Sequence, residues 1–166
     1  MIEQMKQTQF IGIVGHKKSG KTTLVELLAR EMTDRGLLVG TIKMTTHDLE
    51  FDSLGKDTYR HRIAGSRLTL IKSKKQVAIF SDLAYFDDEQ IRLIFQKCDF
   101  VFIEGDSISQ NPKIYVVDKR EPRADIAGEI IAIWGIQQNQ SDMPHFDKEQ
   151  IKELCDFLVN KYQNRR

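Results

Sequence analysis

The sequence is poor in cysteine and has no long apolar run. Its two cysteines, Cys98 and Cys155, lie far apart and lack the spacing of a metal site. We therefore expect both to be reduced thiols in or near the core, and we expect a cytoplasmic protein. No apolar stretch approaches the length of a membrane-spanning helix. The polar first residues, "MIEQMKQTQ", lack the apolar centre of an export signal.

The chain also lacks a marked charge of either sign and any internal divider. It has 25 basic and 24 acidic residues and a formal net charge of +1. Such a balance gives no general electrostatic reason to expect binding to nucleic acid or to a membrane. Repeats, low-complexity tracts and Pro- or Gly-rich linkers are absent. The length of 166 residues suits one domain, 1–166, with a sizeable core.

One short stretch carries the strongest chemical signal. Residues 15–22, "GHKKSGKT", fit the phosphate-binding pattern G-x-x-x-x-G-K-[ST]. The apolar run before them, residues 10–14, predicts a strand buried on both faces. After them, leucines follow at helical spacing, and Gly36 is placed for a left-handed helix cap. The motif therefore lies between a strand and a helix, which is the context that it requires.

The predicted loop would hold phosphate through its backbone, because its glycines permit close approach and the first amides of a helix lack partners. We expect Lys21 to add charge at the β- and γ-phosphates and Thr22 to help hold Mg²⁺. Lys21 is also the candidate catalytic residue. The candidate nucleotide-binding residues are Gly15, His16, Lys17, Lys18, Ser19, Gly20, Lys21, Thr22 and Thr23.

The rest of the chain alternates strands and helices. We expect strands at residues 37–43, 67–71, 76–81, 100–103, 114–117 and 130–134, with a hairpin at "KSKK". We expect helices within 45–64, at 88–97 and at 148–162, capped by Asp87 or Asp88 and by Asp147. This alternation predicts an α/β fold with a predominantly parallel sheet, helices on both faces and the ligand site at the carboxyl ends of the strands.

A second constellation is the stretch "DFVFIEGD", residues 99–106. Glu104 stands at the carboxyl end of its strand, where a carboxylate can reach Mg²⁺ directly or through water. Asp99 begins the strand and would lie at the opposite end of the sheet, whereas Asp106 is an alternative to Glu104. Thr22 and Glu104 are therefore the candidate metal residues. A solvated carboxylate in a turn is the plainer interpretation.

A polar segment, residues 41–67, follows the second strand. Lys43 and Asp48 lie near that strand's end, and Asp57 has helical spacing to Arg60 and His61. A solvated helix with internal ion pairs explains the segment equally well. His47 and His61 have no Cys/His companions at ligand spacing, which argues against zinc.

Taken in order, these motifs resemble the molybdopterin-guanine dinucleotide biosynthesis protein B family. The similarity covers nearly the whole chain and includes "GHKKSGKTT", residues 41–66, "VFIEG", "PKIYVV" and "EIIAIWG". The resemblance implies a P-loop NTPase-like fold and a GTP-binding accessory protein in molybdenum cofactor biosynthesis, with at most weak GTP hydrolysis. The implied cofactors are GTP and Mg²⁺. The implied partners are the molybdenum cofactor guanylyltransferase, molybdopterin-containing proteins and a second copy in a homodimer.

Carried over by position, the resemblance adds Gly55 and Gly105 and a set of substrate or switch residues. With Arg60 from the spacing, that set is Lys43, His47, Asp48, Lys56, Asp57 and Arg60. The chain departs from the family pattern at Met44, Leu54, Ser107 and Asp118. The guanine-reading pattern [N/T]-K-x-D is absent, so the expectation of GTP comes from the resemblance alone.

Two other functions stay open at this point. In a small-molecule kinase, Arg60, Arg62 and Arg67 would clamp phosphates, and an acidic residue near Asp48 or Asp57 would deprotonate the acceptor. In a non-enzymatic binding module, the loop would only hold an anion. The accessory protein differs from the kinase in its slow expected turnover, because the sequence shows no evident water-orienting glutamine or catalytic arginine.

Overall fold

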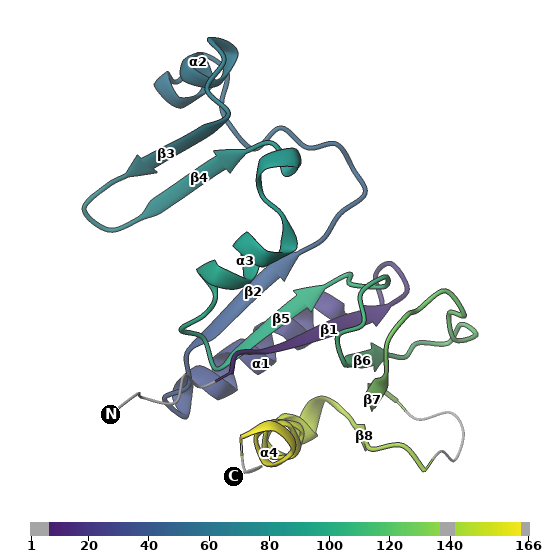
Figure 1. Ribbon diagram of the computed structural model, residues 1–166. Helices are drawn as coiled ribbons and strands as arrows, with labels where there is room; N and C mark the ends of the chain where they lie inside the picture. Colours follow the sequence, from purple (N-terminus) through teal and green to yellow (C-terminus); the bar gives the residue numbers. More distant parts are fainter. Residues whose placement is uncertain (1–6, 137–141, 164–166) are drawn as a thin grey trace. The chain divides into compact units, whose positions relative to one another are not determined.

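The computed structural model describes residues 7–136 and 142–163, and the chain divides into two compact units (Figure 1). Unit 1 comprises Met1–Thr45 and Phe95–Arg166, and unit 2 comprises Thr46–Ile94. That residues 1–166 act as one nucleotide-binding domain stays a prediction.

Unit 1 is built on a six-stranded sheet in the order β2-β5-β1-β6-β7-β8, in which every pair of neighbours is parallel. The strands are β1 (Gln9–Gly15), β2 (Val39–Lys43), β5 (Phe100–Glu104), β6 (Lys113–Val116), β7 (Ile130–Trp134) and β8 (His145–Phe146). The predicted parallel α/β fold is confirmed. The predicted strands agree with the observed ones within two residues, apart from β8, which the sequence patterns did not indicate.

The core of unit 1 follows from alternation along the strands. On β5, Phe100 and Phe102 join one buried cluster, and Val101 and Ile103 join another. Because successive side chains of a strand point to opposite faces, these clusters lie on opposite sides of the sheet. The larger cluster also contains the buried residues of helices α1 (Lys21–Asp34) and α4 (Ile151–Tyr162), which contact each other.

The C-terminal end of α1 and the start of α4 lie where the sequence predicts them. Gly36, with φ of +80°, ends α1, and the amides of Gly36 and Leu37 donate to the carbonyls of Thr33 and Met32. Asp147 forms a capping box with Gln150 and starts a 3₁₀ turn, Lys148–Gln150, that leads into α4.

The cysteines also behave as predicted. Cys155 is buried and Cys98 half-buried, and both are free thiols. Burial raises the pKa of Cys155 to about 12, so this thiol stays protonated at neutral pH.

Unit 2 contains α2 (Asp57–Ile63), an antiparallel hairpin of β3 (Leu68–Lys72) and β4 (Val77–Ser81), a 3₁₀ turn (Leu83–Tyr85) and α3 (Asp88–Ile94). The hairpin is confirmed. Of the two cap candidates, Asp87 accepts the amides of Glu89 and Gln90. Within residues 46–94, all of which are described, Thr69 is the one buried residue.

Helix α3 is three residues shorter than the predicted range 88–97. It ends at Ile94, and the Phe95 ring instead meets Phe10 edge-on and lies against Gly40 in unit 1.

In the described ranges, none of the helices combines the length and apolar character that crossing a bilayer requires.

Gly15 ends β1 in a conformation that only glycine adopts easily, and its replacement tests the packing at this turn. Its φ is +144°, and an added Cβ would lie 2.5 Å from the carbonyl oxygen of Val116. Gly36 also has positive φ, but an added Cβ there meets nothing within 4 Å. We expect Gly36→Ala to lower the free energy of unfolding by about 1–2 kcal/mol. Gly15→Ala should exceed that loss by at least about 1 kcal/mol, because a backbone group must also move.

Urea unfolding of both variants checks this expectation. Equal losses would show that the contact between β1 and β6 tolerates a side chain at Gly15.

Candidate phosphate-binding site

The loop between β1 and α1 has the strand–loop–helix setting that the motif predicts. Three of its residues have positive φ, namely Gly15 (+144°), Lys18 (+64°) and Gly20 (+103°). Gly20 is the N-cap of α1 and supplies no side-chain cap. The first amides of α1 therefore have no cap from their own helix and are available to an anion.

Lys21 reaches back over this loop. Its Nζ donates to the carbonyl oxygens of Gly15 at 3.1 Å and His16 at 2.5 Å. Burial lowers the pKa of Lys21; the charge of Glu104 opposes that effect, and Lys43 and two arginines add to it. The cation is thus held at the loop, where a phosphate would compete with two carbonyls for it.

Ser19 provides a second sign that the loop is built for a ligand. Its Oγ is buried and has no hydrogen-bond partner among the described residues. An unsatisfied buried hydroxyl is unfavourable by about 1–3 kcal/mol, and a phosphate oxygen or an ordered water would satisfy it. The loop therefore fits an oxyanion ligand.

Glu104 completes the arrangement at the end of β5. Its Oε1 accepts a hydrogen bond from Thr22 Oγ1 at 3.0 Å and forms an ion pair with Lys43 Nζ. The Glu104 side chain is 10% exposed and that of Lys43 is 61% exposed. Lys43 and Ile13 are the register partners of Glu104 on β2 and β1. The parallel sheet thus brings four predicted site residues together: Lys21, Thr22, Lys43 and Glu104.

Thr22 and Glu104 offer oxygen donors that suit Mg²⁺, which is usually held by one or two protein oxygens together with water and substrate phosphates. Within residues 7–136 and 142–163, no group of three or more His, Cys, Asp or Glu side chains could hold a metal by itself. The donor set fits a magnesium ion bound with a phosphate ligand and does not resemble an all-protein metal cage.

Asp106 has a different role from the one considered for it as an alternative to Glu104. It is 1% exposed, and its carboxylate accepts hydrogen bonds from Ser109 and from Asn111. It also forms an ion pair with the fully buried Lys113, whose Nζ lies 3.7 Å away. Burial would raise the pKa of Asp106, but these hydrogen bonds and the Lys113 charge outweigh it and lower the pKa. Asp99 lies at the other end of the sheet, as predicted, and there it accepts the Leu38 amide at 2.8 Å.

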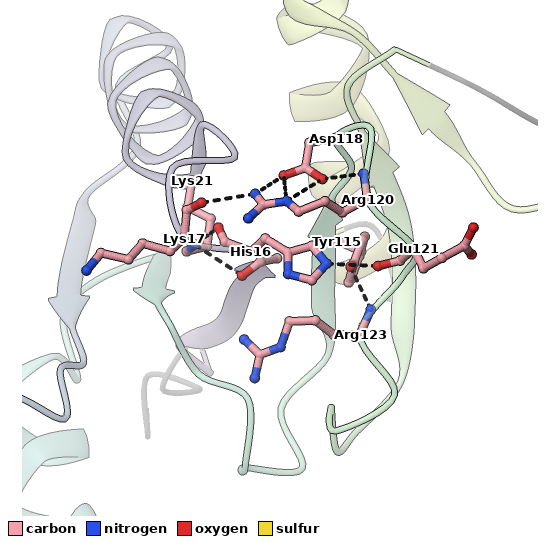
Figure 2. A network of polar contacts seen from close by, with 9 residues as sticks. His16, Lys17, Lys21, Tyr115, Asp118, Arg120, Glu121 and Arg123 are labelled. Carbon is pink, nitrogen blue, oxygen red and sulfur yellow. Dashed lines mark hydrogen bonds and ion pairs between the residues drawn. The ribbon is translucent and has the colours of Figure 1, made fainter.

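A segment after β6, residues 118–125, also contacts the phosphate loop (Figure 2). His16 Nε2 lies 2.8 Å from the carbonyl oxygen of Glu121, and Arg120 Nη2 donates to the carbonyl oxygen of Lys17 at 3.0 Å. Asp118 holds the Arg120 guanidinium in an ion pair. Sequence reasoning noted Asp118 only as a departure from a family pattern and missed the arginine.

The remaining predicted residues, His47, Asp48, Lys56, Asp57 and Arg60, lie in unit 2. Asp57 and Arg60 face each other at 3.8 Å in an exposed ion pair. Arg62 pairs with Glu50, and Arg67 pairs with Asp82 at 3.3 Å. The three arginines that a kinase would need are therefore engaged with carboxylates of their own unit. A shared role of these residues with the phosphate loop stays a prediction.

Comparison with known proteins decides the family. The family model "Molybdopterin guanine dinucleotide synthesis protein B" (MobB) matches residues 10–135, more than half of the chain. The chain belongs to the MobB family. The match spans the phosphate loop, unit 2 and the strands through β7, so the resemblance carried by the motifs is confirmed.

Two bacterial MobB relatives cover most of the chain. An adapter protein of molybdopterin-guanine dinucleotide biosynthesis from Escherichia coli (strain K12) is 30% identical over 156 residues, 87% of this chain and 88% of that one. One of the same description from Haemophilus influenzae is 29% identical over 162 residues, 93% of this chain and 89% of that one.

Solved MobB structures share the fold. A crystal structure of molybdopterin-guanine biosynthesis protein B has a TM-score of 0.73 at 24% identity and covers 93% of this chain and 99% of its own. The crystal structure of Bacillus subtilis MobB has a TM-score of 0.73 at 22% identity, and the match covers 93% of this chain and 98% of that one. The predicted fold class is thus confirmed for this MobB chain.

Asp106 and Lys113 form a buried ion pair beside β1, and Asp106→Asn tests how much this pair stabilises the MobB chain. Removing one partner of a buried pair leaves an uncompensated charge on Lys113, so we expect a loss of about 3–5 kcal/mol in the free energy of unfolding at pH 7. The control is Asp156→Asn, because Asp156 is exposed and pairs with Arg35 on the surface. It should change stability by less than about 1 kcal/mol.

Asp106→Asn should also change how the free energy of unfolding depends on pH. Because folding lowers the pKa of Asp106, its stabilisation is present above its unfolded pKa of about 3.9 and is lost as pH falls through the folded value. Urea unfolding from pH 7 to 3 should show this acid loss in the wild type and a smaller one in Asp106→Asn. Parallel curves would show that Asp106 is not held as a charged group.

Proposed function

We propose that this MobB protein is an adapter that binds GTP with Mg²⁺ during the formation of molybdopterin guanine dinucleotide. Family membership and the relatives named as adapter proteins support the pathway. The observation that carries the nucleotide site is the hydrogen bond between Thr22 and Glu104, because it places a hydroxyl and a carboxylate at the mouth of the phosphate loop. The preference for GTP rests on the family resemblance.

The residues have separate roles in this proposal. The amides of the loop and of the first turn of α1 would hold phosphate oxygens, and the Ser19 hydroxyl would gain the partner that it lacks. The Lys21 ammonium would exchange its contacts with two carbonyls for a phosphate. Thr22 would bind Mg²⁺ directly and Glu104 directly or through water, and the bound ion would neutralise phosphate charge.

We propose that hydrolysis is weak at most. Fast phosphoryl transfer to water uses an arginine aimed at the developing charge. Arg120 and Arg123, the arginines that follow β6, are paired with Asp118 and Asp125. An adapter that retains its nucleotide suits this arrangement better than a rapid enzyme.

We further propose a cytoplasmic homodimer that acts with the molybdenum cofactor guanylyltransferase and with molybdopterin-containing proteins. Unit 2 supports a dimer, because apolar residues of its hairpin are exposed, among them Leu68 (59%), Leu70 (56%) and Val77 (56%). An isolated two-stranded hairpin is marginally stable at best in water. A second copy would cover this apolar surface.

Lys21→Ala tests whether the phosphate loop holds the nucleotide. Losing a charge-assisted contact should weaken GTP binding by about 1.5–3 kcal/mol, roughly ten- to a hundredfold. Lys152→Ala, which removes an exposed lysine of α4, is the matched control and should leave affinity within about twofold of the wild type. Calorimetric titration of GTP and ATP, with and without Mg²⁺, gives the dissociation constants. Wild-type affinity in Lys21→Ala would refute the site, and equal affinity for ATP would refute guanine preference.

Glu104→Gln tests the metal side of the site. The amide keeps the shape of the side chain but loses its charge, so GTP affinity should fall about tenfold in Mg²⁺ and no more than about twofold in EDTA. Asp99→Asn removes a carboxylate from the other end of β5 and should affect both conditions equally little. If Glu104→Gln lost the same factor with and without Mg²⁺, Glu104 would not be the metal-side carboxylate.

A further inference from the structure

We propose that Arg120 is a positioning residue that orients the Lys17–Lys18 peptide so that the Lys18 amide faces the phosphate ligand. This inference rests on the proposed nucleotide site and adds to it a residue outside the phosphate-binding motif. It concerns how the loop is prepared for its ligand, since Arg120 contacts the loop backbone and acts through it.

The contact itself is well anchored. Arg120 Nη2 donates to the carbonyl oxygen of Lys17 at 3.0 Å, and Arg120 Nε donates to the Asp118 carboxylate at 2.9 and 3.1 Å (Figure 2). The Arg120 amide also donates to Asp118 Oδ1 at 2.9 Å. The planar guanidinium has several donors in fixed directions, so a carboxylate on one edge sets the direction of the others. Asp118 thereby aims Arg120 at Lys17.

Peptide geometry carries this direction into the loop. The described residues contain no cis peptide bonds, and in a trans peptide the C=O and N–H groups point in opposite directions. Because Arg120 draws the Lys17 carbonyl toward the segment after β6, the Lys18 N–H must point to the other side of the peptide. That amide has no acceptor among the described residues.

The backbone that follows supports an anion site on that side. Lys18 has φ of +64°, the one non-glycine residue with positive φ in the described chain, and this conformation is unfavourable for a lysine without outside support. Alternation of right- and left-handed residues directs successive amides into one concave nest that binds anions. Arg120 supplies the outside support at the peptide that enters Lys18.

A second contact holds the same segment to the preceding loop residue. His16 Nε2 lies 2.8 Å from the Glu121 carbonyl oxygen, and since a carbonyl only accepts, His16 is the donor. Segment 118–121 therefore meets the loop at residues 16 and 17 with donors running in both directions. If Asp118 and Arg120 formed only a surface ion pair, neither the contact of Arg120 with Lys17 nor that of Glu121 with His16 would be needed.

Arg120→Gln tests the inference, with Arg123→Gln as the matched control. Both changes remove one positive charge from the same segment, but Arg123 pairs with Asp125 and makes no hydrogen bond to the phosphate loop in the described chain. With Mg²⁺–GTP and with tripolyphosphate, Arg120→Gln should weaken binding about tenfold and Arg123→Gln no more than about twofold. Asp118→Asn, which leaves the arginine in place, should lose about threefold and have no further effect in Arg120→Gln.

A spectroscopic readout separates positioning from a general structural role. In ¹⁵N-labelled wild type, tripolyphosphate should shift the Lys18 amide proton strongly downfield, together with those of Gly20 and Lys21. In Arg120→Gln the Lys18 shift should be lost while the Gly20 and Lys21 shifts remain. If the urea midpoint of Arg120→Gln equals that of Arg123→Gln, both variants fold. If Arg120→Gln does not fold, the Lys18 amide shift is measured in Asp118→Asn instead.

The outcomes distinguish this inference from the function on which it rests. If the wild type binds GTP and the Lys18 amide shifts equally in Arg120→Gln and Arg123→Gln, the positioning role is wrong and the nucleotide site stands. If neither GTP nor tripolyphosphate binds to the wild type, both proposals fall.

Discussion

The hydrogen bond from Thr22 to Glu104 is the contact on which the site depends. It joins the start of α1 to the end of β5, and the parallel register places Ile13, Lys43 and Glu104 side by side on three strands. A carboxylate that is 10% exposed needs partners, and Thr22 and Lys43 provide them. The sheet thus places a charged, oxygen-rich corner next to a loop whose Lys18 amide has no acceptor among the described residues.

The loop is supported on two sides. Lys21 holds its carbonyls from within, and segment 118–121 holds it from the β6 side through His16 and Lys17. Such support matters because Gly15, Lys18 and Gly20 all have unusual backbone angles that a free chain would rarely adopt together. A loop already held in its binding conformation pays less entropy when a ligand arrives.

Local patterns were enough to predict most of unit 1. Apolar runs located the central strands, and Asp147 and Gly36 marked helix ends because capping depends on neighbours in sequence. Contacts set by strand order were missed. Arg120 reaches Lys17 because β1 and β6 are adjacent in the sheet, and Lys113 was not recognised as buried because its partners come from a loop that folds over it. The end of α3 was misjudged because Phe95 packs against Phe10.

A structure of the protein with a non-hydrolysable GTP analogue and Mg²⁺ tests the central claim most directly. We expect the β- and γ-phosphates to lie within the loop of residues 15–22, the ammonium of Lys21 to move from its carbonyl partners to phosphate, and the metal to lie beside Thr22 and Glu104. A nucleotide bound elsewhere, with the contacts of Lys21 to Gly15 and His16 unchanged, would contradict it.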